Sequence, residues 1–182
     1  MADNDLEALW DAHCRCEFDT RDVDATMATM VDEPYVNHIP TMTGGVGHDE
    51  LKRFYKYHFI GVNPPDFRLT SISRTVGRDR VVDEFIVHFT HTTEIDWMLP
   101  GIAPTGREVE VPTVAIVQFD GDKLVHEHIY WDQASVLVQI GILDPAGLPV
   151  AGGETARKAL DKTAPSNVLM GQTWMRSASQ PI

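Results

Sequence analysis

The chain has 182 residues, of which 43% are hydrophobic and 23% charged, so it carries enough apolar material for one domain with an extension. Its formal net charge of -12 argues against nucleic acid as a partner, because phosphate binding needs clustered lysines and arginines. No apolar run approaches the roughly 20 residues of a membrane-spanning helix, so no membrane partner is expected. The acidic start is unlike a signal peptide, and Cys14 and Cys16 are too close on a predicted helix to pair with each other. We therefore expect a cytoplasmic protein with free thiols.

Three amphipathic helices are predicted in the first third of the chain. The first has its apolar stripe at spacings of three and four residues, namely Leu6, Leu9, Trp10 and His13. The second is capped by Asp22 and stopped by Pro34, and it contains Met27, Met30 and Val31. The third begins at His48 and has one stripe made of Leu51, Phe54, Tyr55, His58 and Phe59. Between the second and third helices, residues 34–40 read as an extended stretch and the glycines at 44, 45 and 47 as a turn.

After the third helix the apolar period changes to two, which predicts strands. Four strands are predicted over residues 67–76, 80–94, 107–119 and 123–132, followed by a helix over 133–142. Helices first and an antiparallel meander afterwards indicate the α+β class, with the helices covering one face of a curved sheet around a pocket.

The domain organisation follows from the same pattern. Residues 1–143 form the predicted pocket domain, and residues 144–182 form an extension with a short helical stretch over 154–162. The strand over 80–94 is apolar on both faces, so a second subunit is expected to cover the outer face in a homodimer. The extension is too apolar for a free solvated end and is expected to wrap that second subunit, with Val168, Leu169, Met170, Trp174 and Met175 as its apolar residues.

The last predicted strand carries the ionisable residues. Four polar side chains share one face by alternation: His126, His128, Tyr130 and Asp132. This face either meets water or is covered by the helices. The three amphipathic helices favour cover, which predicts that Asp132 lies in a partly dry cavity where its pKa can be tuned for proton transfer.

At this point the chain resembles SnoaL-like polyketide cyclases of the nuclear-transport-factor-like superfamily. The resemblance lies in four runs, spread over roughly residues 5–143: 37–40, 89–92, 104–111 and 119–124 leading to Trp131-Asp132. It implies a cone-shaped fold, usually dimeric, with a deep pocket. It also implies a general acid/base at Asp132, a pocket histidine at His91, and intramolecular aldol closure without a cofactor.

The candidate site combines these expectations. Asp132 is the predicted proton-transfer group, with His91 and His38 as hydrogen-bond partners of a substrate oxygen. Further candidates for substrate contact are Tyr130, His128, Tyr55, Phe59, Trp97 and, in second rank, Glu84. For four of them a structural role stays open: His38 as a partner of loop backbone, His91 as a core histidine, and Tyr55 and Phe59 as core residues.

Neither a metal nor a cofactor is predicted. His126 and His128 with Asp132 offer ligand types for a first-row metal, but no dense ligand cluster appears and no nucleotide-binding motif is present. The leading expectation is a cofactor-free enzyme for a small apolar carbonyl or epoxide, by cyclisation, isomerisation or dehydration. The alternative is a non-catalytic small-ligand-binding or dimeric interaction module, because one fold hosts many functions.

Overall fold

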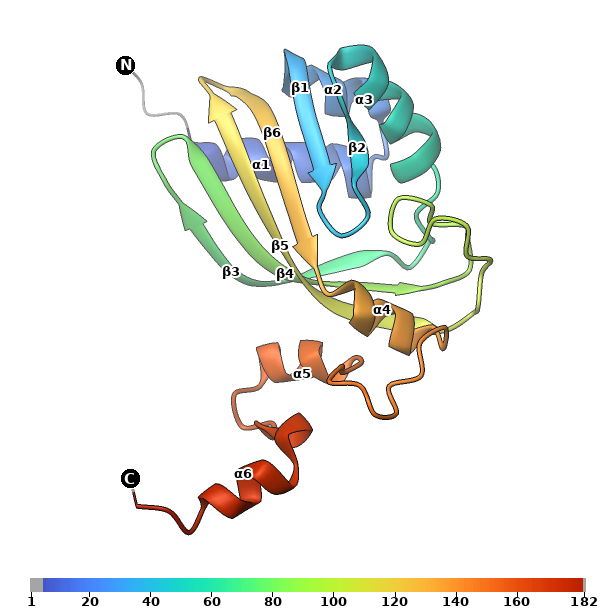
Figure 1. Cartoon of the computed structure of the whole chain (residues 1–182). Helices are drawn as coiled ribbons and strands as arrows, with labels where there is room; N and C mark the ends of the chain where they lie inside the picture. Colours follow the sequence, from blue (N-terminus) through green and yellow to red (C-terminus); the bar gives the residue numbers. More distant parts are fainter. Residues whose placement is uncertain (1–4, 182) are drawn as a thin grey trace.

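The computed structural model describes residues 5–181 and has the predicted α+β class (Figure 1). Six strands form one curved sheet in the order β2-β1-β6-β5-β4-β3. All neighbours are antiparallel except β1 and β6, which are parallel. The strands are β1 (Met30–His38), β2 (Thr43–Val46), β3 (Arg68–Val76), β4 (Arg80–Thr90), β5 (Glu108–Asp120) and β6 (Lys123–Trp131).

Helices lie before the first strand, between β2 and β3, and after the last strand. Two of them, α1 and α3, each run on into a π-helical turn, η1 and η2. The bounds are α1 (Leu6–Cys14), η1 (Arg15–Asp19), α2 (Val23–Ala28), α3 (His48–Phe54), η2 (Tyr55–Phe59), α4 (Gln133–Gln139), α5 (Glu154–Leu160), η3 (Val168–Met170) and α6 (Gln172–Ser177). Within residues 5–181, no helix is long and apolar enough to cross a membrane.

The predicted cap of the second helix is present, but the helix is shorter than expected. Asp22 caps α2 by accepting from the amide of Ala25 at 3.0 Å. The helix ends at Ala28, and Met30 already belongs to β1, where it pairs with Leu124 of β6. Pro34 lies inside β1, where the register shifts, because a proline cannot donate to the ladder.

The glycines predicted as a turn also form part of β2. Gly44 pairs with Asn37 and has a φ of 141°. A Cβ at Gly44 would lie 2.0 Å from the carbonyl oxygen of Val36, so only glycine allows the two chain segments to approach this closely. The hairpin of β1 and β2 is therefore built on a strand position that no other residue can fill.

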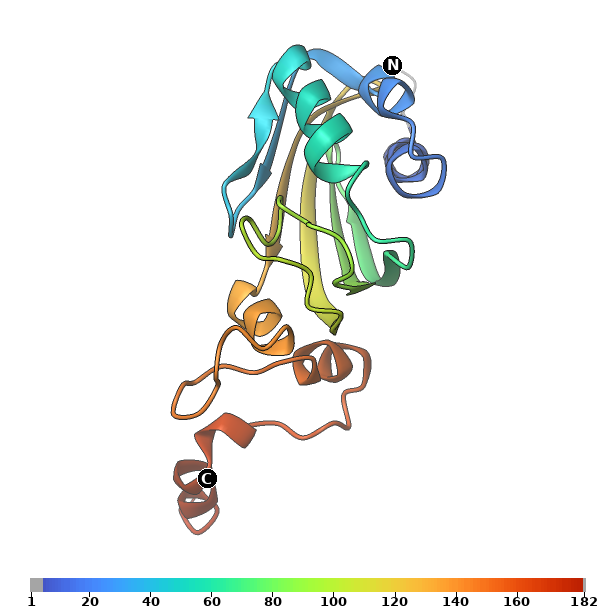
Figure 2. The ribbon, with the colours of Figure 1, turned by 90° about the vertical axis from the view of Figure 1, so that its right-hand side faces the viewer.

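The core lies between the inner face of the sheet and the N-terminal helices. The inward residues of β4 include Phe85 and Val87, and those of β6 include Ile129 and Trp131; all four are buried. The C-terminal residues beyond α5 extend away from this core (Figures 1 and 2). The inner face is thus where a site can be sheltered from water.

Candidate functional site

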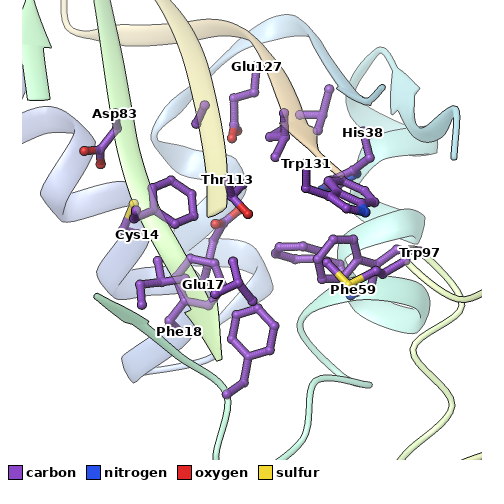
Figure 3. A pocket seen from close by; sticks show the side chains of 18 of the residues that line it. Cys14, Glu17, Phe18, His38, Phe59, Asp83, Trp97, Thr113, Glu127 and Trp131 are labelled. Atoms are coloured by element: carbon purple, nitrogen blue, oxygen red, sulfur yellow. The ribbon is translucent and has the colours of Figure 1, made fainter. Parts of the chain in front are cut away.

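A cavity lies at the centre of the inner face, walled mainly by aromatic rings (Figure 3). Its unfilled space measures about 50 Å³, room for a few water molecules. The ring-bearing residues that line it are Trp10, Phe18, His38, Tyr55, Phe59, Phe67, Phe85, Trp97 and Trp131. Three carboxyl groups also line it, those of Glu17, Asp83 and Glu127. An apolar cavity with few polar groups is typical of small-molecule sites.

The polar end of the cavity is a buried cluster built from α1, η1, η2 and β6. His13 Nε2 lies 3.1 Å from Glu17 Oε1 and 3.2 Å from Glu127 Oε1. The Tyr55 hydroxyl donates to Glu127 Oε1 at 3.2 Å. The other ring nitrogen of His13 lies 2.6 Å from the hydroxyl of Thr29. Both nitrogens of the imidazole are thus engaged, as expected of a doubly protonated ring.

The charges in this cluster follow from burial and proximity. Burial is the largest influence on His13 and lowers its pKa, but Glu17 and Glu127 together outweigh it and raise the pKa to about 10. For Glu17, burial raises the pKa of the carboxyl against the opposing effect of the His13 cation. Burial, with the nearby Glu127, raises the pKa of Tyr55 well above its ordinary value, so the phenol keeps its proton. The cluster therefore holds an imidazolium, a phenol donor and a carboxyl that burial drives toward its protonated form.

A second buried carboxyl group, that of Asp83, joins α1 to the sheet. Trp10 Nε1 donates to Asp83 Oδ2 at 2.8 Å, and Arg74 reaches the same oxygen at 2.8 Å. Figure 3 shows Asp83 on β4, at the side of the cavity away from His38 and Trp97. Because its charge is already paired with a guanidinium, Asp83 fits a structural role at the cavity edge.

His38 lies among aromatic rings at the opposite side of the cavity. Its ring centroid is 4.8 Å from that of Trp97 and 5.8 Å from that of Trp131. His38 Nδ1 lies 3.2 Å from the carbonyl oxygen of Thr43, which only accepts, so Nδ1 carries the hydrogen and Nε2 is an acceptor. Burial lowers the pKa of His38 to about 4, although Glu127 opposes this, and the ring is neutral at physiological pH.

Trp97 is fixed by the loop that follows β4. Its indole Nε1 donates to Asn63 Oδ1 at 2.9 Å, and its carbonyl oxygen accepts from the hydroxyls of Thr41 and Thr43, both at 2.8 Å. The loop is therefore tied to the β1–β2 hairpin and to the turn after η2, where Asn63 lies. This brings the loop over one end of the cavity and presents the indole to it.

Four of the residues predicted from the sequence line the cavity: His38, Tyr55, Phe59 and Trp97. Their predicted contacts are partly altered. His38 was expected to donate to a substrate oxygen, but its bond to Thr43 leaves only an acceptor nitrogen for the cavity. Tyr55 was expected in the apolar wall, yet its hydroxyl points to the acidic cluster.

The predicted location of Asp132 is wrong. Asp132 is exposed and caps helix α4, with Oδ1 accepting from the amides of Ala134 at 2.9 Å and Ser135 at 3.2 Å. The alternation along β6 was predicted correctly, but the opposite face points inward. Ile129 and Trp131 are the large apolar side chains of this strand, and the free energy of burying them decides which face meets the helices.

Three further candidates lie on the outer face of the sheet for the same reason. Tyr130 is 40% exposed, and His128 is half-buried with its ring centroid 5.5 Å from that of Tyr35. Glu84, also half-buried, accepts from the hydroxyl of Ser73 at 2.8 Å. None of the three lines the cavity.

His91 is fully buried but outside the cavity lining. Its Nδ1 accepts from the amide of Thr105 at 3.3 Å, and burial lowers its pKa. This hydrogen bond closes the loop over residues 91–105. His91 therefore fits the structural role of a core histidine.

Sequence reasoning missed the acidic cluster. His13 was recognised as part of a helix stripe, and Glu17 stands four residues later, the spacing at which two helical side chains meet. Glu127 stands at the same parity as Ile129 and Trp131, which marks the inward face. These two signals together would have located the cluster.

The same cluster is also the group that comes nearest to a metal site. Within residues 5–181, one set of three potential ligand atoms lies within 4.8 Å of one another, from His13, Glu17 and Glu127. The contacts of 3.1 and 3.2 Å have hydrogen-bond geometry, and a metal ion would have to displace the proton that the two glutamates hold on His13. The donor set therefore fits an ion-paired cluster better than a resident metal.

Several solved structures have the same fold as this chain. AclR from Streptomyces galilaeus, a candidate hydroxylase, is 20% identical with a TM-score of 0.58 over 76% of this chain and 96% of its own. A candidate SnoaL-like polyketide cyclase from Jannaschia sp. CCS1 is 19% identical with a TM-score of 0.57 over 76% and 94%. TsrD from Streptomyces laurentii is 16% identical with a TM-score of 0.58 over 76% and 96%.

At such identities these structures show a common fold, and no curated protein matches the chain. A family assignment comes from the sequence itself. Residues 10–127, more than half of the chain, match the SnoaL-like domain. The matched span runs from Trp10 in α1 to Glu127 in β6 and so includes both ends of the acidic cluster. The chain therefore belongs to the SnoaL-like domain family.

Proposed function

We propose that this chain is a cofactor-free acid–base enzyme that acts on a small, mostly apolar carbonyl compound or epoxide. The observation that carries the proposal is the position of Glu127, whose carboxylate lines an aromatic cavity and accepts from Tyr55 and His13. A carboxylate that is held in a dry site by fixed donors is suited to remove a proton adjacent to a carbonyl group.

The proposed roles follow from the hydrogen bonds and charges. Glu127 takes the proton and returns it to a neighbouring carbon of the same substrate, and Tyr55 and His13 position its carboxylate. Glu17, whose pKa burial raises, donates a hydrogen bond to the substrate oxygen and keeps its proton over the cycle. The Nε2 acceptor of His38 receives a substrate hydroxyl at the far side of the cavity. Protons are thus taken from and returned to one substrate, which requires no external oxidant or reductant.

A non-catalytic ligand-binding module is the second candidate. The observation in its favour is the small unfilled space of about 50 Å³, which suits a ligand of few atoms or one end of a larger molecule. Buried ion pairs also occur as purely structural elements. The two candidates differ in whether the pocket exchanges protons with its ligand.

Proton exchange is tested without knowledge of the natural substrate. The protein is incubated in D2O with a panel of small ketones, and deuterium at the α-carbon is followed by NMR. We expect exchange with at least one ketone, and a loss of about 100-fold or more in Glu127→Gln, the scale of one general acid–base group.

The matched control is Asp132→Asn, which neutralises the carboxylate that the sequence favoured. Asparagine is as good a helix cap as aspartate, so helix α4 is kept. We expect exchange at the wild-type rate in this variant. Equal exchange in wild type and Glu127→Gln, or none across ketones that bind, would favour the binding module.

The proposal also covers the ligand, the assembled state and the location of the protein in the cell. We propose a small molecule as ligand, a homodimer as the assembled state, and a cytoplasmic location without nucleic-acid binding. The net charge of -12 supports the exclusion of nucleic acid. The apolar outer face of the sheet, with Val82 36% and Tyr130 40% exposed, supports the dimer.

A further inference from the structure

The second ring nitrogen of His38, Nε2, is a buried hydrogen-bond acceptor in the cavity wall. His38 is 3% exposed and lines the cavity. Its Nδ1 hydrogen goes to the carbonyl oxygen of Thr43, the register partner of His38 across the β1–β2 hairpin, so the hairpin itself fixes the tautomer. Four aromatic rings surround the imidazole with centroids 4.8 to 5.8 Å away, those of Phe54, Phe59, Trp97 and Trp131.

The two indoles beside His38 donate their hydrogens elsewhere. Trp97 Nε1 donates to Asn63 at 2.9 Å, and Trp131 Nε1 donates to Gln133 at 2.6 Å. The other two ring donors of the cavity wall serve buried carboxylates, namely those of Trp10 and Tyr55. Because buried acceptors are ordinarily paired, the partner of His38 Nε2 must come from the contents of the cavity, and a ligand there must carry a hydrogen-bond donor.

The polar end of the cavity favours a different group, a carbonyl oxygen. Burial drives Glu17 toward its protonated form, in which the carboxyl group donates a hydrogen bond. Glu127 Oε1 already accepts from Tyr55 and His13, which leaves the other oxygen of this carboxylate to take a proton. The two ends of the cavity therefore differ in chemistry, with a donor beside the base at one end and the acceptor nitrogen of His38 at the other.

His38 and Glu127 are close enough for one small molecule to reach both. In the parallel ladder of β1 and β6, Val36 pairs with Glu127 and His38 pairs with Ile129. The two inward side chains therefore lie on neighbouring strands, offset by roughly 7 Å along them. The free space of about 50 Å³ holds about three to five water-sized groups. A ligand that fills it has about that number of non-hydrogen atoms.

We infer that the substrate is a small hydroxy ketone, whose carbonyl oxygen accepts from Glu17 and whose hydroxyl group donates to His38 Nε2. This substrate class rests on the proposed function, which places the carbonyl group beside Glu127. His38 then determines specificity, because a ketone without a hydroxyl group leaves the buried nitrogen unpaired. A site that is built to bind a hydroxyl group discriminates strongly against analogues that lack it.

An isosteric pair of ligands tests this selection in the wild-type protein. Hydroxyacetone and 2-butanone share the same carbonyl group and differ only by a hydroxyl group in place of a methyl group. We expect hydroxyacetone to bind at least about tenfold more tightly in titrations followed by protein NMR, the scale of one hydrogen bond. Equal or tighter binding of 2-butanone, or no binding of hydroxyacetone, would overturn the inference.

Two variants locate the hydroxyl contact. His38→Phe keeps a flat ring but removes the acceptor nitrogen, and the control His91→Phe makes the same change at a buried histidine outside the cavity lining. We expect the preference for hydroxyacetone over 2-butanone to fall by about tenfold in His38→Phe and to stay unchanged in His91→Phe. An undiminished preference in His38→Phe would show that the hydroxyl group is bound elsewhere.

A spectroscopic measurement in the wild-type protein serves if His38→Phe does not fold. The ¹⁵N signal of His38 Nε2 is expected to move upfield with hydroxyacetone and not with 2-butanone, because only the hydroxyl group donates to it. The same signal position with both ligands would refute the contact.

These binding measurements separate the substrate class from the proposed chemistry. Hydroxyacetone that binds through His38 without exchange of its α-protons would contradict the enzyme and keep the hydroxy ketone as a ligand. Exchange of both ketones with equal affinities would overturn the selection by His38 and leave the acid–base chemistry standing.

Discussion

Single residues decide which carboxyl group performs proton chemistry in this pocket. Asp132 has the better sequence context, yet it caps a helix in water. Glu127 is 4% exposed and has a phenol and an imidazolium as partners. Of the two carboxyl groups, only that of Glu127 lines the cavity and can contact a substrate inside it, which favours Glu127.

His38 provides a prediction at the same scale. Because burial lowers its pKa to about 4, the acceptor form persists from neutral pH down to about pH 5. If His38 Nε2 binds a substrate hydroxyl, ligand affinity or exchange rate falls only as the pH drops through about 4. We expect the His38 ring protons to titrate near this pH in an NMR series. A His38 midpoint close to 6.5 would contradict the burial of the ring.

At the scale of elements, the His13 cluster fastens α1 and its π-helical turn to β6. Removing the cation leaves two buried carboxyl groups without their partner, and breaking a buried pair in this way typically costs about 3–5 kcal/mol. We expect His13→Gln to lower the free energy of unfolding by this amount at pH 7, measured by urea denaturation. His48→Gln, the same change at an exposed histidine, is expected to cost less than about 0.5 kcal/mol.

The pH dependence of this loss has a defined sign. The pKa of His13 is about 10 in the folded chain and about 6.5 in an unfolded one. The stabilisation is fully present below pH 6.5 and is lost as the pH rises toward 10. The difference between wild type and His13→Gln should therefore shrink from pH 7 to pH 10, and a constant difference over that range would show that His13 is not charged in the folded protein.

The sequence was sufficient for most elements but not for the orientation of one strand. Apolar periods of 3.6 and 2 located α1, α3 and four strands within a few residues, because periodicity reflects which side of an element is buried. Met30 was assigned to a helix because short apolar runs fit both helix and strand, and pairing with β6 decided the outcome. Alternation on β6 separated Asp132 from Trp131 correctly, but which face turns inward depends on long-range packing that no local pattern contains.

The sequence likewise predicted some residues of the cavity and missed others. Tyr55 and Phe59 were found because they lie on the apolar stripe of a predicted helix, and such a stripe faces the core wherever the pocket lies. His38 was proposed from an extended stretch and Trp97 from a loop, neither of which has a predicted inner face. Glu17 was not found because a charged side chain on a helix is ordinarily solvated. Its burial depends on His13 being placed against β6, which only the tertiary structure brings about.

For the whole molecule, assembly is expected to protect the C-terminal residues. Trypsin cleaves after Lys162, which precedes the exposed residues 165–181, and after Arg176, which lies among them. The measured quantity is the fraction cleaved at Arg176 per unit time, divided by the trypsin concentration. We expect this normalised rate to fall as the protein concentration rises through the dimer Kd. A Trp174→Glu variant should show cleavage that is independent of protein concentration. Concentration-independent cleavage of the wild type would mean that no partner copy covers this segment.

The polar end of the inner cavity is built around a charged histidine between two glutamates, and the protonation state of that ring can be measured. A two-bond ¹H–¹⁵N correlation spectrum of the histidine rings at pH 7.5, with His13→Gln for assignment, reports the protonation and tautomer of each ring. We expect His13 to show two protonated nitrogens and His38 to be neutral with hydrogen on Nδ1. A neutral His13 at this pH would contradict the buried ion-paired cluster, and with it the assignment of Glu127 as the proton-transfer group.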